Sequence, residues 1–386
     1  MKFCVIGPTY PYRGGIAHYT SLLVQHLREA HEVLFVSFSR QYPTWLFPGK
    51  SDKDPSKRPL STEAEYLLDP INPWTWRKTM QRLKLFQPEV VVIPWWHWYF
   101  APAWTVLSRQ IKRLSSKPKL IFICHNVAPH EQGRLSRMML PTTTKLALGK
   151  GDGFIVHSQP DGRLLRAYLP EAAYVVTPHP TYAELGVKNT EAIQLPVVLP
   201  AERPLLLFCG IIRPYKGLDV LLDAFAIALE RQPLHLLIAG EFWQGGEAEY
   251  RKQIEDLKLQ NHVSIINEYI PDDWLAACID RADVVVLPYK SATQSGIIQV
   301  AFGRGKPVIT TNVGGLGEVV ENGRTGLVVP PEEPEALAEA IQNYLHNNLQ
   351  KEFSYNLQAE EGAFCWATLL DAIIVLTRAD RSSLPS

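Results

Sequence analysis

The chain has 386 residues, of which 46% are hydrophobic and 20% are charged. This length accommodates two domains of ordinary size, and the hydrophobic fraction excludes a mainly disordered protein. The 39 Lys and Arg residues equal the 39 Asp and Glu residues, so the formal net charge is zero. Neutrality argues against the basic footprint of a simple nucleic-acid binder, and we expect no nucleic-acid partner.

The charge is divided unevenly along the chain. Lys and Arg outnumber Asp and Glu by 23 to 13 in residues 1–185, but they are outnumbered 16 to 26 in residues 186–386. This asymmetry indicates either an acidic partner for the first half, such as an anionic membrane, or simply two different solvated surfaces. Seven of the ten Trp residues lie between Trp45 and Trp104, which suits core packing or a membrane-interface belt.

Cysteine usage and apolar stretches bear on the compartment. Cys4, Cys124 and Cys209 lie in short apolar runs, which is typical of buried thiols in a reducing cytosol. The apolar run at the N-terminus is too short for a signal peptide. The longest uncharged stretch, residues 90–108, contains two Pro residues, so we interpret it as a strand, a loop and a helix start rather than a membrane span. We expect a cytoplasmic protein with peripheral contact to the inner face of the membrane.

Short apolar runs alternate with stretches of helical spacing along the whole chain. Because β-branched residues fill these runs nearly continuously, they predict parallel strands covered on both faces. In the first half they are Phe3–Ile6, Val33–Val36, Val90–Ile93, Leu120–Cys124, Phe154–Val156 and Tyr174–Val176. In the second half they are Leu205–Cys209, Leu236–Ala239, Val263–Ile266, Val284–Leu287, Val308–Thr310 and Leu327–Val329. Repeated units of this kind predict a doubly wound α/β protein.

Two irregular stretches interrupt the pattern. Pro-rich residues 177–203 are predicted to be an inter-domain linker, and residues 41–72 are predicted to be a long loop. We expect an N-terminal domain over residues 1–185, a C-terminal domain over residues 186–360, and a final helical segment within residues 361–386. Two such domains that face each other place a ligand cleft between their strand ends.

Glycine-rich segments follow the first strand of each half and precede a helix. Gly14 and Gly15 let the backbone approach a bound group closely, although a plain tight turn explains them as well. Gly210 shares a loop with Arg213 and Lys216, which offers a diphosphate two cations and free backbone N–H groups. The alternative is a solvated basic turn. Neither segment matches a dinucleotide fingerprint or a P-loop.

A third candidate follows the strand Val284–Leu287. Gln294, Ser295 and Gly296 open a helix there. Small polar residues and Gly at a helix start form either a seat for an anion or an ordinary N-cap.

A histidine stands at the carboxyl end of the strand Leu120–Cys124. His125 lies there together with His130 and Glu131, where the cleft is expected. Two His residues and a Glu so close together favour a functional role for His125. Their spacing does not place two ligands on one helical face, so we expect no metal.

Together these motifs resemble the family-4, or group 1, retaining glycosyltransferases, which have the GT-B architecture of two Rossmann-like domains facing a central cleft. The resemblance covers nearly the whole chain. It is most specific in the second half, in Gly210-x-x-Arg213-x-x-Lys216-Gly217, Ala239-Gly240, Ala282-Asp283, Gly305-x-Pro-Val-Ile and Gly314-Gly-x-x-Glu318. The closing helix resembles the segment that crosses back to the first domain in this fold.

The resemblance implies retaining transfer of a sugar from a nucleotide-diphosphate donor to an acceptor hydroxyl, without a metal or cofactor. By the family's pattern, Arg213 and Lys216 grip the diphosphate, and His125 contacts the transferred sugar or its bridging region. Tyr269 and Ile270 face the nucleobase. The other expected donor-binding residues are Gly14, Gly15, Gly210, Gln294, Ser295, Gly296 and Glu318. The expected acceptor is lipid-linked or a glycan, in cell-envelope or exopolysaccharide synthesis.

One part of the family's pattern is missing. The two glutamates that precede the Gly-x-Pro-Val-Ile element fall at Ala292 and Val300, neither of which is acidic. The candidates to replace them are Thr293, Gln294, Ser295 and Gln299. Two alternative functions therefore stay open: a non-catalytic partner subunit that binds a nucleotide sugar, and a sugar-nucleotide epimerase of the same fold.

Overall fold

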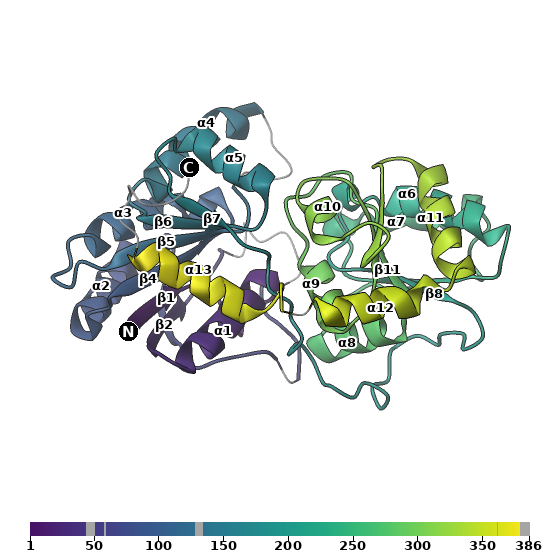
Figure 1. Ribbon diagram of the computed structural model, residues 1–386, viewed down its shortest axis with the longest axis horizontal. Coiled ribbons are helices and arrows are strands. Elements are labelled where there is room, and N and C mark those ends of the chain that lie inside the picture. Colours follow the sequence, from purple (N-terminus) through teal and green to yellow (C-terminus); the bar gives the residue numbers. More distant parts are fainter. Residues whose placement is uncertain (44–50, 58, 128–133, 361, 379–386) are drawn as a thin grey trace.

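The computed structural model describes residues 1–43, 51–57, 59–127, 134–360 and 362–378. It contains two parallel β-sheets, each with its own helices, which lie side by side along the longest axis of the molecule (Figure 1). The predicted α/β class and the two Rossmann-like layers are confirmed.

The first sheet has seven strands in the order β3-β2-β1-β4-β5-β6-β7. They are β1 (Lys2–Ile6), β2 (Glu32–Phe38), β3 (Glu65–Leu68), β4 (Val90–Trp95), β5 (Lys119–Cys124), β6 (Gly153–Val156) and β7 (Tyr174–Val176). Its helices are α1 (Gly15–Arg28), α2 (Pro73–Phe86), α3 (Ala101–Ile111), α4 (Arg134–Leu148) and α5 (Gln159–Tyr168). The strand order reverses between β1 and β4, and such a switch point opens a crevice beyond the carboxyl ends of the strands.

The second sheet has six strands in the order β10-β9-β8-β11-β12-β13. They are β8 (Leu205–Cys209), β9 (His235–Ala239), β10 (Val263–Ile266), β11 (Val284–Leu287), β12 (Val308–Thr311) and β13 (Gly326–Val329). Its helices are α6 (Leu218–Leu229), α7 (Glu247–Asp256), α8 (Asp272–Arg281), α9 (Gly296–Gly303), α10 (Leu316–Val319), α11 (Pro334–His346) and α12 (Leu349–Ala359). The switch point here lies between β8 and β11, so the two sheets offer two facing crevices.

All twelve predicted strands are present, and the structure adds one. β3 lies within the stretch that we expected to be a long loop, so that expectation was wrong for residues 65–68. Among the described residues it pairs only with β2, through a register shift, and a single one of its four residues is buried. An edge strand of this kind has no continuous apolar run, because most of its side chains face water.

The interpretation of the uncharged stretch at residues 90–108 is confirmed. It forms β4, a 3-10 turn (Trp98–Phe100) and the start of α3. All six residues of β4 are buried, because the strand lies inside the sheet and both faces are covered. Among the described residues, no helix is long and apolar enough to span a bilayer.

The last described helix returns to the first sheet. Residues 177–203 connect β7 to β8 without a helix or strand. After α12, helix α13 (Trp366–Arg378) packs against β5, β6 and α1, and Figure 1 shows it in yellow across the first sheet. Its first residue, Trp366, is buried and donates a hydrogen bond from Nε1 to the carbonyl oxygen of Thr181 (3.2 Å).

Candidate functional site

A cavity of about 650 Å³ lies between the two sheets. Its lining comes from loops that follow β1, β4 and β5 of the first sheet and β8 to β11 of the second. Ten of the twelve predicted site residues line it, namely Gly14, Gly15, Gly210, Arg213, Lys216, Tyr269, Ile270, Gln294, Ser295 and Gly296. The structure therefore gathers residues from both halves of the chain at one place, although His125 and Glu318 are not part of the lining.

The loop after β8 brings two cations to the cavity. A Cβ atom at Gly210 would lie 2.9 Å from Nζ of Lys216, so the lysine head group lies directly over this glycine. Desolvation by the surrounding protein lowers the pKa of Lys216 to about 8, and the nearby charge of Arg213 acts in the same direction. The guanidinium of Arg213 lies 3.4 Å from the ring centroid of Trp243. Both cations sit at a strand's carboxyl end, where an anionic ligand would neutralise them.

The N-terminus of α9 also faces the cavity. Ser295 is its N-cap residue, and no side chain caps the helix there. Gln294 donates a hydrogen bond from Nε2 to the carbonyl oxygen of His157 (3.1 Å), and its buried Oε1 has no partner among the described residues. A bare helix N-terminus and a fixed amide oxygen together offer donors to an anion and an acceptor to a hydroxyl.

The four candidates for the missing glutamates separate into two groups. Gln294 and Ser295 line the cavity, whereas Thr293 and Gln299 do not. Thr293 donates a hydrogen bond from Oγ1 to Oδ1 of Asn126 in the first domain (2.5 Å). Gln299 is buried inside α9 with both amide atoms unpartnered in the described part of the chain. Gln294 and Ser295 are thus the candidates that a ligand in this cavity can reach.

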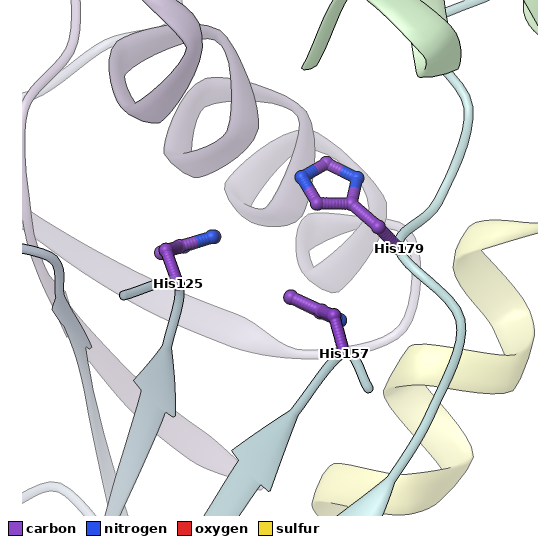
Figure 2. Close-up of side chains that lie close together, drawn as sticks. All are labelled: His125, His157 and His179. Carbon is purple, nitrogen blue, oxygen red and sulfur yellow. The ribbon is translucent and has the colours of Figure 1, made fainter. Parts of the chain in front are cut away.

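His125 is not among the residues that line the cavity. Its side chain is buried, and its ring centroid lies 5.4 Å from that of His157 and 6.0 Å from that of His179. Figure 2 shows the three side chains close together. Burial, reinforced by the other two histidines, holds the pKa of His125 well below its usual value. The neighbouring Asn126 reaches the cavity instead. His130 and Glu131, which we grouped with His125, lie outside the described residues, as does Trp45.

His157 and His179 were not predicted from the sequence. Burial lowers the pKa of His157 to about 4 and that of His179 to about 3. Each follows a predicted strand as a single His, so neither stood out by itself. The signal that would have found them is their position at the ends of strands adjacent to that of His125.

Glu318 lies at the domain interface and not in the cavity lining. It belongs to the short helix α10, and its carboxylate accepts a hydrogen bond from the backbone N–H of Gln159 (3.0 Å). Gln159 opens α5 in the first domain. In this structure Glu318 therefore contacts the opposite domain.

Two further polar clusters join the domains at the cavity and were also missed. Arg13 pairs with Glu241 (2.8 Å), and its guanidinium lies 4.9 Å from the ring centroid of Tyr269. His18 of α1 lies between two carboxylates, with Nε2 3.2 Å from Asp272 and 3.8 Å from Asp54.

The three side chains of the His18 cluster are buried. Burial disfavours the charged imidazole, but the two neighbouring carboxylates of Asp272 and Asp54 favour it and raise the pKa of His18 to about 9. At neutral pH a buried imidazolium therefore ties α1 to the start of α8.

Comparison with known proteins covers both halves of the chain. A family model described as glycosyl transferases group 1 matches residues 189–360, and one described as glycosyltransferase family 4 matches residues 13–183. A D-inositol 3-phosphate glycosyltransferase of Saccharomonospora viridis is 25% identical over 277 residues, which cover 67% of this chain and 64% of that protein. Its counterpart in Pseudarthrobacter chlorophenolicus is 36% identical over 140 residues, or 36% and 33% of the two chains. The aligned part thus spans less than two thirds of these relatives.

Solved structures match the fold over nearly the whole length. Anabaena HepE in complex with UDP superimposes with a TM-score of 0.70 at 18% identity, covering 97% of this chain and 98% of that one. Sucrose-phosphate synthase from Thermosynechococcus elongatus gives a TM-score of 0.69 at 20% identity, with 98% of both chains covered. The chain therefore belongs to the group 1, family-4 glycosyltransferases and has their GT-B fold.

Proposed function

We propose that the protein is a retaining glycosyltransferase that moves a sugar from a nucleotide-diphosphate donor to an acceptor hydroxyl, without a metal ion in the reaction. The observation that carries this proposal is the cavity itself. It brings Arg213, Lys216 and the uncapped N-terminus of α9 together on one side, facing the first domain on the other. That arrangement suits a diphosphate with an acceptor opposite it. A structural relative, HepE, has been solved with UDP-glucose.

Arg213 and Lys216 can stabilise the leaving group in this reaction. When the glycosidic bond breaks, negative charge builds up on the departing nucleoside diphosphate, while the sugar acquires oxocarbenium character. Arg213 can hold two phosphate oxygens with its planar fork, and Lys216 adds a point charge next to the backbone of Gly210. Groups fixed in place before the reaction stabilise the transition state without reorganisation.

Other residues that line the cavity can contact the nucleobase and the sugar of the donor. Tyr269 and Ile270 follow β10 and provide the wall assigned to the nucleobase. The unpartnered Oε1 of Gln294 is an acceptor for a hydroxyl of the donor sugar, in place of the first missing glutamate. The expected contact of His125 with the sugar stays a prediction, since its side chain is buried and is not part of the cavity lining.

Transfer is tested by nucleoside diphosphate release. The purified chain is incubated with a panel of nucleotide sugars, with and without membrane extract as the acceptor source, and the anomeric configuration of the product is read by NMR. Release that requires the extract, with retained configuration, supports the proposal. Binding without release identifies a non-catalytic partner subunit, whereas release without an acceptor identifies epimerase chemistry, and either result overturns the proposal.

We further propose that the acceptor is lipid-linked or a glycan of the cell envelope, and that the first domain docks on an anionic membrane. The support is α2 and the residue before its cap, where Ile71, Trp74 and Leu85 are exposed. Trp74 is 73% exposed and lies under the guanidinium of Arg77, so an aromatic ring and a positive charge face water together. Such pairs suit the headgroup layer of a membrane.

Sedimentation with lipid vesicles tests this docking. The wild-type chain is expected to bind vesicles that contain anionic lipid, and the W74A variant is expected to bind them less. Trp243, in the second domain, offers the control variant W243A, which should sediment like wild type. Equal binding to neutral vesicles removes the electrostatic part of the proposal.

A further inference from the structure

Three neighbouring strands of the first sheet each deliver a histidine to the same edge. His125 comes directly after β5, His157 directly after β6, and His179 three residues after β7. The last residues of these strands are paired in register, Cys124 with Val156 and Val156 with Val176. Because adjacent strands lie about 4.8 Å apart, the three imidazoles converge at the carboxyl ends. Figure 2 shows the three rings gathered around one space.

The hydrogen bonds of two of the rings fix which nitrogen is available. Nδ1 of His157 lies 3.0 Å from the carbonyl oxygen of Thr177, and Nδ1 of His179 lies 2.9 Å from that of Pro180. A carbonyl oxygen only accepts, so both Nδ1 atoms carry the hydrogen and each Nε2 keeps a lone pair. Histidines that bind metal ions are held in this way, with the other ring nitrogen donating to a backbone carbonyl or a carboxylate.

The Nε2 atoms of the three histidines are buried and have few hydrogen-bond partners among the described residues. Nε2 of His125 and Nε2 of His157 have no hydrogen-bond partner among the described residues, and both side chains are buried. In the described part of the chain, the only partner of Nε2 of His179 is the hydroxyl of Tyr182, at 3.4 Å. A buried polar atom without a partner is costly, so two in one cluster call for a ligand or another physical explanation.

We propose that His125, His157 and His179 bind a divalent first-row transition-metal ion, with zinc as the reference case. One ring nitrogen of each residue lies within 4.8 Å of those of the other two. An ion at the centre of a triangle with 4.8 Å sides lies about 2.8 Å from each corner, and zinc–imidazole bonds are about 2.0–2.1 Å long. Each ring therefore has to move inward by about 0.7 Å, which a small side-chain rotation supplies.

The donor set limits the kind of ion. Three imidazoles suit zinc, cobalt, nickel or copper, whereas magnesium and calcium require oxygen ligands, and the cluster contains no carboxylate. Three histidines also leave a fourth tetrahedral position for a water molecule. The ion would tie the ends of β5 and β6 to the start of residues 177–203, where the chain leaves the first domain. This role is separate from sugar transfer and does not depend on it.

The experiment measures metal binding by the full-length chain. The protein is stripped with a chelator, reloaded with one equivalent of Zn²⁺ or Co²⁺, and passed through a desalting column before its metal content is measured. We expect one retained ion per chain, the visible absorption of tetrahedral cobalt, and a higher melting temperature with zinc. The H157Q and H179Q variants should lose all three signals.

The control is H235Q, because His235 is a buried histidine of the second domain whose Nε2 is paired with Ser264. It should retain the ion like wild type. H179C keeps a ligand at the site and should add a thiolate-to-cobalt charge-transfer band, which makes the test independent of how well the Gln variants fold. No retained ion in folded wild type, equal retention in H157Q and H179Q, or no new band in cobalt-loaded H179C would each overturn the proposal.

Discussion

Replacing His18 by Gln is expected to destabilise the protein at pH 6 but far less at pH 10. Nε2 of His18 lies 3.2 Å from Asp272 and 3.8 Å from Asp54, and these contacts raise the pKa of the imidazole from 6.5 to about 9. A rise in pKa of this size corresponds to about 3–4 kcal/mol, since a tenfold change in the proton-binding constant is worth about 1.4 kcal/mol. The side chain of His18 is buried, so salt screens little of this energy.

The direction of the pH dependence follows from linkage. The folded state holds its proton more tightly than the unfolded state, whose histidine titrates near 6.5. The contribution is therefore complete below pH 6.5 and is lost as the pH rises through about 9. The stability difference between wild type and H18Q should shrink over that window.

Urea unfolding from pH 6 to pH 10 measures this difference. His346 lies on the exposed side of α11, so H346Q provides a control that should track wild type at every pH. A gap between wild type and H18Q that stays constant from pH 6 to pH 10 would refute the buried imidazolium. The reasoning would fail equally if the gap widened with pH.

Four other substitutions test the cavity and its supports. R213A and K216A should each lower kcat/KM by ~10²–10³-fold while circular dichroism stays unchanged, as expected for loss of a preorganised charge; full activity in both would remove the phosphate site. G217A should destabilise the protein several times more than G323A. Both glycines have a positive φ (+70° and +79°), but of the two only Gly217 has a backbone oxygen, that of Pro288, where a Cβ atom would lie. Equal melting temperatures of the two variants would contradict this clash. R13A should cost about 3–5 kcal/mol by leaving the buried Glu241 carboxylate without its cation, and adding E241Q should restore part of the loss in thermal unfolding; a double variant no more stable than R13A would argue against the pair.

The strands and the cavity could be predicted because their signals are local. β8 and β11 are runs of four or five buried apolar residues, and any such run flanked by turn residues is visible in the sequence alone. Gly210, Arg213 and Lys216 occur within a stretch of seven residues, so the loop that carries them could be predicted from the sequence. β3 was missed because three of its four side chains are at least partly exposed.

The contacts between distant segments could not be predicted in this way. Asp54 and Asp272 are 218 positions apart in the sequence, and only the packing of the two domains brings both to His18. The same holds for His157 and His179, whose proximity to His125 depends on the strand order β5-β6-β7. A lone histidine after an apolar run is usually structural, so strand order has to be known before three of them count as a cluster.

The lowered pKa of Lys216 has a consequence for donor binding. With a pKa of about 8, this lysine is roughly half protonated at pH 8 when the cavity holds no anion. A diphosphate favours the charged form, so binding should draw up to about half a proton from the buffer at pH 8 and almost none at pH 6. Calorimetry in buffers of different ionisation enthalpy would show this uptake as a slope at pH 8. The protein would then take up protons together with its donor, and donor affinity would fall as the solution becomes more alkaline.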